Sequence, residues 1–275
     1  MHAISSAKSL LFLPAHRLDR FATAKASGAN LVCVDLQDGL PEKEKDRGRQ
    51  AVKDLLQHEL DILVGVRINS LVTEYGMHDL RMLGSCPNSP HAVIGPVIEH
   101  AREIDAVVME SGDLLAAASL IVMIETANAI CAIDSVCAAC PKNAALLFGN
   151  ADMSTAIRCA NDWESLAYVR GRLILFAAKW GLPVFDGVTI DLEREDLLEE
   201  ECIKGRKLGF VGKAAIHPKQ VKVINRTFCP SADEIAEART IVAAYLSSSG
   251  GAIRVGKTMV DRPVYLAAAS LLKTL

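Results

Sequence analysis

The stretch that decides the fold is LVCVDLQDGLPEKEKDRGRQAVKDLLQHELDILVGVRINS, residues 31–70. It begins with the apolar run LVCVDL (31–36) and ends with ILVGVRI (62–68), and both runs have the length and β-branched content of buried strands. Between them, PEKEKDRGRQAVKDLLQH carries charges on one face and aliphatic side chains on the other, as a helix that covers a sheet does. The stretch therefore predicts a strand, a helix and a second, parallel strand.

The same alternation continues along the chain. Six further apolar runs are SLLFLP (9–14), AVIGPV (92–97), LIVMIE (120–125), ALLFG (145–149), VFDGVTI (184–190) and GKAAIH (212–217). Glycines at 28, 181 and 209 lie where the intervening helices should end. The eight strand and helix units predict an α/β fold, a TIM (β/α)8 barrel, over residues 1–228. Residues 229–275 are expected to form a C-terminal helical extension within the same structural unit.

Composition supports one large core and excludes several classes of function. The chain has 275 residues, 51% of them hydrophobic, which is enough for a barrel. A formal charge of −3 gives no basic field for nucleic acid or an anionic membrane. The apolar run near the N-terminus is too short for a signal sequence and no later run reaches spanning length, so we expect a cytoplasmic protein. The eight scattered cysteines are expected to be reduced and mostly buried.

Polar side chains follow almost every predicted strand, at the end where a barrel places its chemistry. In chain order they are His16 and Arg17, Asp35 and Asp38, Arg67 and Asn69, Glu125, Asp152, Asp186 with Asp191, and His217. Only the fourth strand is followed by no charged side chain. These residues predict a functional site at one mouth of the barrel.

Glu125 and Asp152 follow neighbouring strands, so they would bring two carboxylates together with room for waters and substrate oxygens. Mg²⁺ is usually bound in proteins by such a set of oxygen ligands. In the alternative interpretation, Asp152 caps the helix that begins MSTAIRC and Glu125 forms a salt bridge at the barrel mouth. The pairing of the two carboxylates favours the metal site.

Arg67 ends an otherwise apolar strand, so its guanidinium must emerge at the mouth or be buried with a partner. There it can bind a carboxylate or an enolate oxygen in fork geometry, and structural pairing with Asp35 or Asp38 is the competing interpretation. His217, in AAIHPKQ, is either a base or a hydrogen-bonded spacer.

Seven segments carry a resemblance to a known family. They are SLLFLPAHRLDRF (9–21), VDLQDGLPEKEK (34–45), VRINS (66–70), MIETANAI (123–130), FGNADMSTAI (148–157), FDGVTIDLEREDLLEEECIKGRKLGFVGKAAIHPKQV (185–221) and GKTMVDRP (256–263). In this order and spacing they resemble the citrate lyase β-subunit-like family, within the HpcH/HpaI aldolase group, over nearly the whole chain.

The resemblance implies a Mg²⁺-dependent carbon–carbon lyase that assembles as a homotrimer and cleaves a citryl, malyl or citramalyl thioester of coenzyme A or an acyl carrier protein. Mg²⁺ would bind the substrate's hydroxyl and carboxylate, and Arg67 would stabilise the acetyl thioester enolate. The residues implied are Arg67, Asp38 and Asp261 for catalysis, Arg17, Arg67, Glu125 and Asn69 for substrate or CoA binding, and Glu125 and Asp152 for the metal. No nucleic acid or membrane partner is expected.

Three functions stay in competition. A stand-alone citramalyl-CoA or malyl-CoA lyase is favoured over the β-subunit of a citrate lyase complex. The third, a thioester-binding barrel without turnover, is prompted by Gln37 and Val97, where the family usually has glutamate and lysine. In the tail, Asp261 either belongs to a lid that acts on a neighbouring subunit or caps a helix that begins near Pro263.

Overall fold

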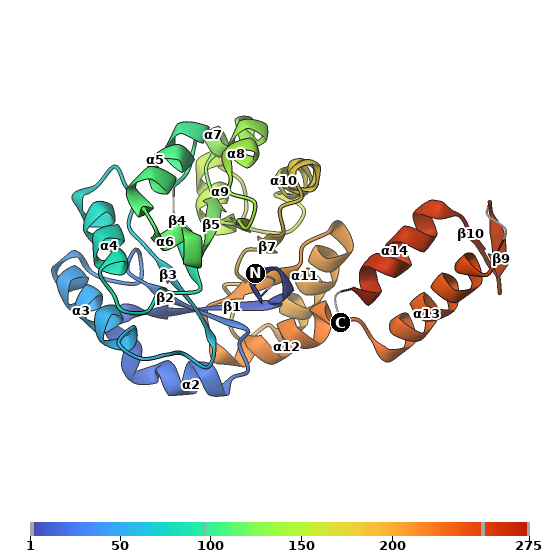
Figure 1. The fold of residues 1–275 in the computed structure, drawn as a ribbon, viewed down its shortest axis with the longest axis horizontal. Helices are drawn as coiled ribbons and strands as arrows, with labels where there is room; N and C mark the ends of the chain where they lie inside the picture. The colour runs from blue at the N-terminus through green and yellow to red at the C-terminus, as the bar shows by residue number, and fades with distance from the viewer. Residues whose placement is uncertain (1–2, 96, 249–250, 274–275) are drawn as a thin grey trace. The chain divides into compact units, whose positions relative to one another are not determined.

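Eight parallel strands close into a barrel in the computed structural model, within the unit Met1–Phe228 (Figure 1). They are β1 (Ser9–Pro14), β2 (Leu31–Asp35), β3 (Leu63–Arg67), β4 (Ala92–Gly95), β5 (Ser119–Ile124), β6 (Ala145–Phe148), β7 (Val184–Asp186) and β8 (Gly212–Ala215). Each strand pairs with its neighbour in sequence, and β1 pairs with β8 to close the ring. The structure describes residues 3–95, 97–248 and 251–273. The predicted barrel is confirmed.

Helices connect the strands and surround the barrel (Figure 1). They are α1 (Ala3–Ser6), η1 (Ala15–Arg20), α2 (Phe21–Ala26), η2 (Glu42–Glu44), α3 (Lys45–Leu55), α4 (Glu74–Gly84), α5 (Ala101–Ser111), α6 (Leu114–Ala117), α7 (Ala127–Cys131), α8 (Ile133–Ala139), α9 (Asn150–Ile157), α10 (Ala167–Trp180), α11 (Glu195–Leu208) and α12 (Pro218–Phe228). Among the residues that the structure describes, no helix is long and apolar enough to cross a membrane.

Strand side chains alternate between the barrel interior and the helix layer. In β2, Leu31 and Cys33 belong to the interior cluster, whereas Val32 packs with residues of the outer layer. Because alternate residues of a strand face the same side, Asp35 also points inward at the end of β2. The same period places Arg67 and Glu125 on the inward side, two residues after Gly65 and Met123. The barrel therefore gathers these charged groups at its C-terminal mouth.

The seventh strand is shorter than its apolar run predicted. VFDGVTI covers residues 184–190, but β7 ends at Asp186. Beyond it, Val188 pairs with the side chain of Asn150, which accepts from Val188 N at 2.8 Å and donates to Val188 O at 3.0 Å. An amide side chain thus takes the place of a neighbouring strand, and the backbone after Asp186 leaves the sheet to border the mouth.

The unit Cys229–Leu275 consists of two helices and a hairpin. Helix α13 (Ala232–Leu246) begins with a capping box between Ser231 and Glu234. Strands β9 (Ile253–Val255) and β10 (Thr258–Val260) pair antiparallel, and α14 (Arg262–Leu272) follows. The sequence predicted helix at α13 and missed the hairpin. All eight cysteines of the chain are free; three are buried, and Cys131 and Cys229 are exposed.

Candidate active site at the mouth of the barrel

Asp35 and Arg67 lie opposite each other at the ends of β2 and β3 and form a buried ion pair. Arg67 Nε lies 2.7 Å from Asp35 Oδ1, and Nη2 lies 2.6 Å from Oδ2. Burial opposes the charge, but the Asp35 contact outweighs it and raises the pKa of Arg67 above its usual value. The fork of the guanidinium is therefore bound to Asp35, as the competing interpretation of Arg67 stated.

Backbone N–H groups of the loop after β2 also donate hydrogen bonds to the carboxylate of Asp35. Gln37 N donates to Asp35 Oδ1 and Gly39 N donates to Oδ2, each at 2.9 Å. A Cβ atom at position 39 would lie 2.7 Å from Asp35 Oδ2, so the loop requires glycine there to approach the carboxylate this closely. Each oxygen of Asp35 thus accepts one loop N–H and one guanidinium N–H, which fixes the orientation of Arg67.

Arg67 Nη1 is the one guanidinium nitrogen that does not bond to Asp35, so it can bind other partners. It lies 3.3 Å from Asp38 Oδ2 and 4.0 Å from the sulfur of Met123. The guanidinium carbon lies 4.8 Å from the centre of the Phe12 ring, over its face. Asp38, Met123 and Phe12 all line the same cavity as Arg67, so Nη1 presents its donors there.

Glu125 follows β5 and is 5% exposed. Its Oε1 accepts a hydrogen bond from Val97 N at 2.9 Å, and no described residue donates to Oε2 or forms an ion pair with this carboxylate. Val97 has a φ of 52°, an uncommon conformation for a β-branched residue. Burial raises the pKa of Glu125, and the charge of Asp152 adds to the rise. Glu125 is a buried acid without a bonded cation.

Asp152 lies in the first turn of α9, which begins at Asn150 with Gly149 as its N-cap. Its carboxylate is exposed and makes none of the hydrogen bonds or ion pairs found among the described residues. The helix therefore begins earlier than the sequence suggested, and Asp152 does not cap it. A Cβ atom at Gly149 would lie 2.9 Å from Glu125 Oε2, so glycine allows α9 to start directly against Glu125.

A cavity of about 360 Å³ occupies the mouth. Asp35, Asp38, Arg67 and Asp152 line its polar side, and Phe12, Met123, Leu147, Ala214 and Ile216 are among its apolar lining residues. Glu125 lies behind Gly149, which is itself part of the lining. The cavity therefore combines several acids, one cation and an apolar wall.

The residues present fit a magnesium ion. Within the described ranges, no group of three or more His, Cys, Asp or Glu side chains is arranged to hold a metal. Mg²⁺ commonly uses only one or two carboxylates and takes its remaining ligands from water and substrate. Burial raises the pKa of Glu125, and among the described residues no cation forms an ion pair with Glu125 or Asp152. Glu125 and Asp152 are thus the residues that would bind Mg²⁺.

Three other predicted site residues lie near the mouth in different environments. Arg17 is in η1 and pairs with Asp19 at 3.2 Å on the surface. Asp38 keeps 65% of its side chain exposed, and partial burial raises its pKa while Arg67 opposes the rise. Asn69 is buried, and both of its amide atoms bond within the barrel. Their roles in substrate binding and catalysis stay predictions.

Asp261 lies in the C-terminal unit, where its Oδ1 accepts from Val264 N at 3.2 Å and caps α14. The capping role is therefore present, and the role in a neighbouring subunit stays a prediction. His217 is exposed at the start of α12 and accepts from Lys219 N. Asp186 is fully buried with Arg170 and Lys213, so the expectation that it reaches the mouth is wrong. It faces the helices because Phe185, one residue earlier, faces the interior.

Two residues that shape the site, Lys45 and Asn150, were not predicted from the sequence. Lys45, the first residue of α3, is buried and holds the loop after β2 through hydrogen bonds to Leu36 O and Gln37 O. Asn150 holds the segment after β7 at Val188. The only signal for Asn150 is an amide directly after a strand, and Lys45 is hidden in the charged run PEKEK.

Comparison with known proteins places this architecture among related chains. The family model described as HpcH/HpaI aldolase/citrate lyase matches residues 8–218. A citrate lyase subunit beta-like protein of Mycobacterium tuberculosis is 32% identical over 272 residues, covering 96% of this chain and 93% of that protein. A protein of Cereibacter sphaeroides named (3S)-malyl-CoA thioesterase is 29% identical over 283 residues, covering 99% and 96%.

A solved structure is similar to this chain over nearly its whole length. The CitE protein of Mycobacterium tuberculosis, in complex with magnesium, acetoacetate and coenzyme A, is 29% identical to this chain. The TM-score is 0.81, and the match covers 98% of each chain. The similarity therefore includes the barrel and the segment that follows it.

Proposed function

The chain belongs to the HpcH/HpaI aldolase/citrate lyase family, and from this premise we propose that it is a Mg²⁺-dependent carbon–carbon lyase. It cleaves a 3-hydroxy-3-carboxyacyl-CoA, of the citramalyl-CoA or malyl-CoA type, to acetyl-CoA and a 2-oxo acid. The observation that carries the proposal is the single cavity onto which Arg67 Nη1, Asp38 and Asp152 open, with Glu125 directly behind it. The magnesium in the structure of the CitE relative is consistent with it.

Glu125 and Asp152 are the residues that would hold the metal. When bound, Mg²⁺ supplies a Lewis acid that orients the substrate's hydroxyl and carboxylate and favours the hydroxyl's loss of a proton. Glu125 is already fixed by Val97 N, and no described residue bonds to the carboxylate of Asp152, so neither carboxylate has to break an ion pair in this part of the chain to bind a cation. The substrate and water would complete the coordination.

Side chains of the protein would transfer the protons and stabilise the enolate. Asp38 accepts the proton of the 3-hydroxyl; its pKa is raised by partial burial, which makes the carboxylate a stronger base than an ordinary aspartate. As the oxygen forms a carbonyl, the neighbouring carbon–carbon bond breaks and its electrons pass to the thioester as an enolate. Arg67 Nη1 donates to the enolate oxygen, and a proton delivered to the enolate carbon completes acetyl-CoA. Asp261 of a neighbouring subunit in a homotrimer is our proposed source of that proton.

The charge of the mouth favours a substrate with one carboxylate. Among the described residues, three acids line the cavity and Glu125 lies behind it, while Arg67 is the only basic residue in the lining and is already paired with Asp35. A citryl thioester would bring a second carboxylate into this negative site. A methyl group or a hydrogen in its place would instead face the apolar wall formed by residues such as Met123 and Leu147. This supports the citramalyl or malyl type.

The test incubates the purified protein and Mg²⁺ with citramalyl-CoA, malyl-CoA and citryl-CoA separately, and follows acetyl-CoA and the 2-oxo acid by chromatography. Equal amounts of both products, lost on chelation of Mg²⁺, are expected with one of the first two substrates. The name of the Cereibacter relative favours thioester hydrolysis as a second candidate, which would release free CoA without acetyl-CoA. Turnover of citryl thioesters alone would favour the citrate lyase β-subunit, and binding of all three without any product would favour the non-catalytic barrel.

A further inference from the structure

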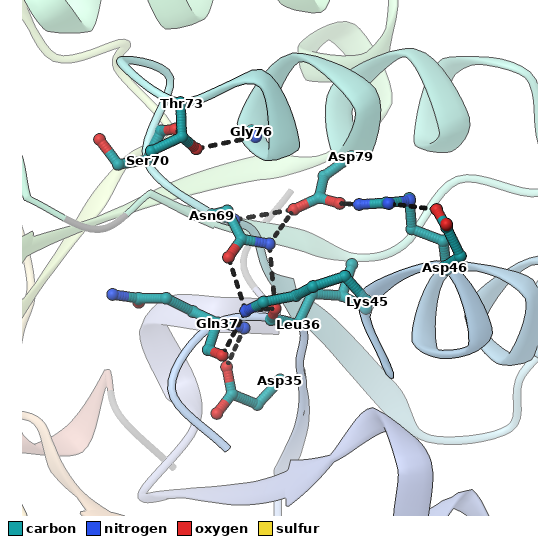
Figure 2. A network of polar contacts seen from close by, with 11 residues as sticks. Asp35, Leu36, Gln37, Lys45, Asp46, Asn69, Ser70, Thr73, Gly76 and Asp79 are labelled. Atoms are coloured by element: carbon teal, nitrogen blue, oxygen red, sulfur yellow. Dashed lines mark hydrogen bonds and ion pairs between the residues drawn. The ribbon is translucent and has the colours of Figure 1, made fainter. Parts of the chain in front are cut away.

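The peptide group between Leu36 and Gln37 joins two networks at the mouth (Figure 2). On one side, Leu36 O accepts from Lys45 Nζ at 2.7 Å and from Asn69 Nδ2 at 2.9 Å. On the other side, Gln37 N donates to Asp35 Oδ1 at 2.9 Å. A trans peptide is planar, with its oxygen and its N–H pointing in opposite directions. Fixing the oxygen therefore aims the N–H at Asp35.

Lys45 uses its whole ammonium group in this contact. Besides Leu36 O, its Nζ lies 2.6 Å from Gln37 O and 2.8 Å from Asn69 Oδ1, so its three donors have three acceptors. The side chain is buried and is not part of the cavity lining. Lys45 is therefore not placed to bind substrate, although it lies within reach of the charges of Asp35 and Asp38.

Asn69 has its amide orientation set from behind by α4. Asp79 is fully buried, and its Oδ2 accepts from Asn69 N at 2.8 Å and from Nδ2 at 2.7 Å. Since the carboxylate can accept only from the NH₂ side, Oδ1 of Asn69 faces Lys45 (Figure 2). Arg49 Nη1 holds the other oxygen of Asp79 at 3.0 Å. The amide is thus a fixed link between α4 and the loop after β2.

We propose that Lys45 and Asn69 are positioning residues for Arg67, acting through the peptide between Leu36 and Gln37 and then through Asp35. The proposal rests on the proposed function, because Arg67 Nη1 must meet the developing enolate oxygen. It also gives Asn69 a role other than the direct substrate contact that the sequence suggested. Apart from the peptide itself, every step from Lys45 to Arg67 is a hydrogen bond of 2.6 to 2.9 Å.

The first test measures the environment of the Arg67 side chain by NMR, without substrate. In protein labelled with ¹⁵N-arginine, the Nε–H resonance of Arg67 is assigned as the one that disappears in Arg67→Lys. Lys45→Met keeps most of the side-chain volume but removes all three donors. In this variant we expect the Arg67 resonance to move and its hydrogen to exchange faster with water. Lys53→Met, on the same helix, is the matched control and should leave the resonance unchanged.

The second test measures kcat and KM for the cleavage of the thioester. Lys45→Met should lower kcat by up to about 10²-fold, the cost of a displacement of roughly 1 Å in a catalytic group, with a much smaller change in KM. Asn69→Ala keeps the ammonium and removes one of the two donors on Leu36 O, so it should lower kcat less. If Lys45→Met does not fold, by circular dichroism, Asn69→Ala decides both readings.

A folded Lys45→Met protein with an unchanged Arg67 resonance would overturn the proposal, whatever happens to kcat. So would a moved resonance with unchanged kcat in a wild type that turns over. If the wild type cleaves none of the three thioesters, the proposed function fails, but the resonance of Arg67 still decides whether Lys45 and Asn69 hold it. The two failures are therefore distinguishable.

Discussion

Two charged clusters lie in the same barrel, one at its mouth and one in its wall. The mouth cluster consists of Asp35, Asp38, Arg67, Glu125 and Asp152. The wall cluster consists of Arg170, Asp186, Glu201 and Lys213, from β7, β8, α10 and α11. In the wall cluster two acids face two bases. Lys213 Nζ lies 2.9 Å from Asp186 and 3.1 Å from Glu201, and Arg170 Nε lies 3.0 Å from Asp186. The mouth cluster has four acids and one base.

In the two clusters, the pKa of a buried carboxylate is shifted in opposite directions. Asp186 is fully buried, which alone would raise its pKa, but Lys213 and Arg170 outweigh burial and lower the pKa below its usual value. Glu125 is almost as buried, and burial raises its pKa because, among the described residues, no bonded cation outweighs it. Burial by itself therefore does not distinguish structure from function. The imbalance of charge does so in our proposal, because an excess of acids over bases in the mouth cluster would favour binding of a cation from solution.

The largest expected effect is the loss of stability when the balance of the wall cluster is broken. Lys213→Met leaves Asp186 and Glu201 without their shared cation and should lower the free energy of unfolding by about 3–5 kcal/mol, measured by urea denaturation. Lys219→Met removes an exposed partner of Glu193 and should cost less than about 1 kcal/mol. Equal effects of the two substitutions would show that the wall cluster does not stabilise the fold.

The next effect is on turnover at the mouth. Arg67→Lys keeps the charge, but a single ammonium cannot hold both oxygens of Asp35 and also reach the cavity as Nη1 does. By analogy with the loss of one oxyanion donor, kcat should fall about 10²–10³-fold, and KM should change much less. Arg226→Lys, in an exposed pair with Glu199, is the control. An unchanged kcat would remove Arg67 from the chemistry.

A smaller effect is expected on metal affinity. Glu125→Gln and Asp152→Asn should each weaken Mg²⁺ binding at least about tenfold in calorimetry without substrate, because each removes a charged oxygen ligand. Neither should destabilise the fold as Lys213→Met does, since neither carboxylate has an internal cation to leave unpaired. Asp191→Asn is the control, because Asp191 is not part of the cavity lining and, in the described part of the chain, its carboxylate accepts from Glu193 N alone. Normal Mg²⁺ binding by both variants would contradict the proposed metal site.

The sequence predicted where charged residues stand along each strand better than which way they face. The apolar runs and their period placed Asp35, Arg67 and Glu125 at strand ends, and the structure has them on the inward side. Asp186 also ends a strand, but it is one residue out of phase with the interior and faces the helices instead. The phase of β7 decides this, because Phe185 takes the inward position, and the apolar run VFDGVTI does not show which of its residues does so.

The hydrogen bonds of Lys45 also could not be predicted from the sequence. The run of charges PEKEK looks like a solvated helix start, and only Lys45 within it is buried. Its three acceptors are two backbone oxygens and the amide of Asn69 in the segment after β3, and none of them has a pattern in the sequence. Composition and periodicity report which face is apolar. They do not report a cation that is buried because carbonyl oxygens surround it.

Asp261 is expected to give the smallest effect, because among the described residues its carboxylate accepts one hydrogen bond, from the backbone N–H of Val264. As the N-cap of α14, it should contribute about 1 kcal/mol to that helix, a contribution that Asp261→Ala removes. Asp261→Ser keeps an accepting oxygen for Val264 N but has no acid. If Asp261 is only a cap, the serine variant should keep wild-type kcat. If it is the proton donor in a trimer, the serine and alanine variants should be equally slow while serine alone keeps the stability.

The proposed action of Asp261 across subunits of a trimer is then tested directly by mixing two variants. Arg67→Ala and Asp261→Ala subunits, unfolded together and reassembled, would form some sites in which both residues are intact. Activity well above the sum of the parents is expected if Asp261 serves its neighbour. Mass spectrometry establishes that mixed trimers have formed. If they have, and activity stays at the parental level, then Asp261 does not act across subunits and its charge, like that of the wall cluster, belongs to the fold.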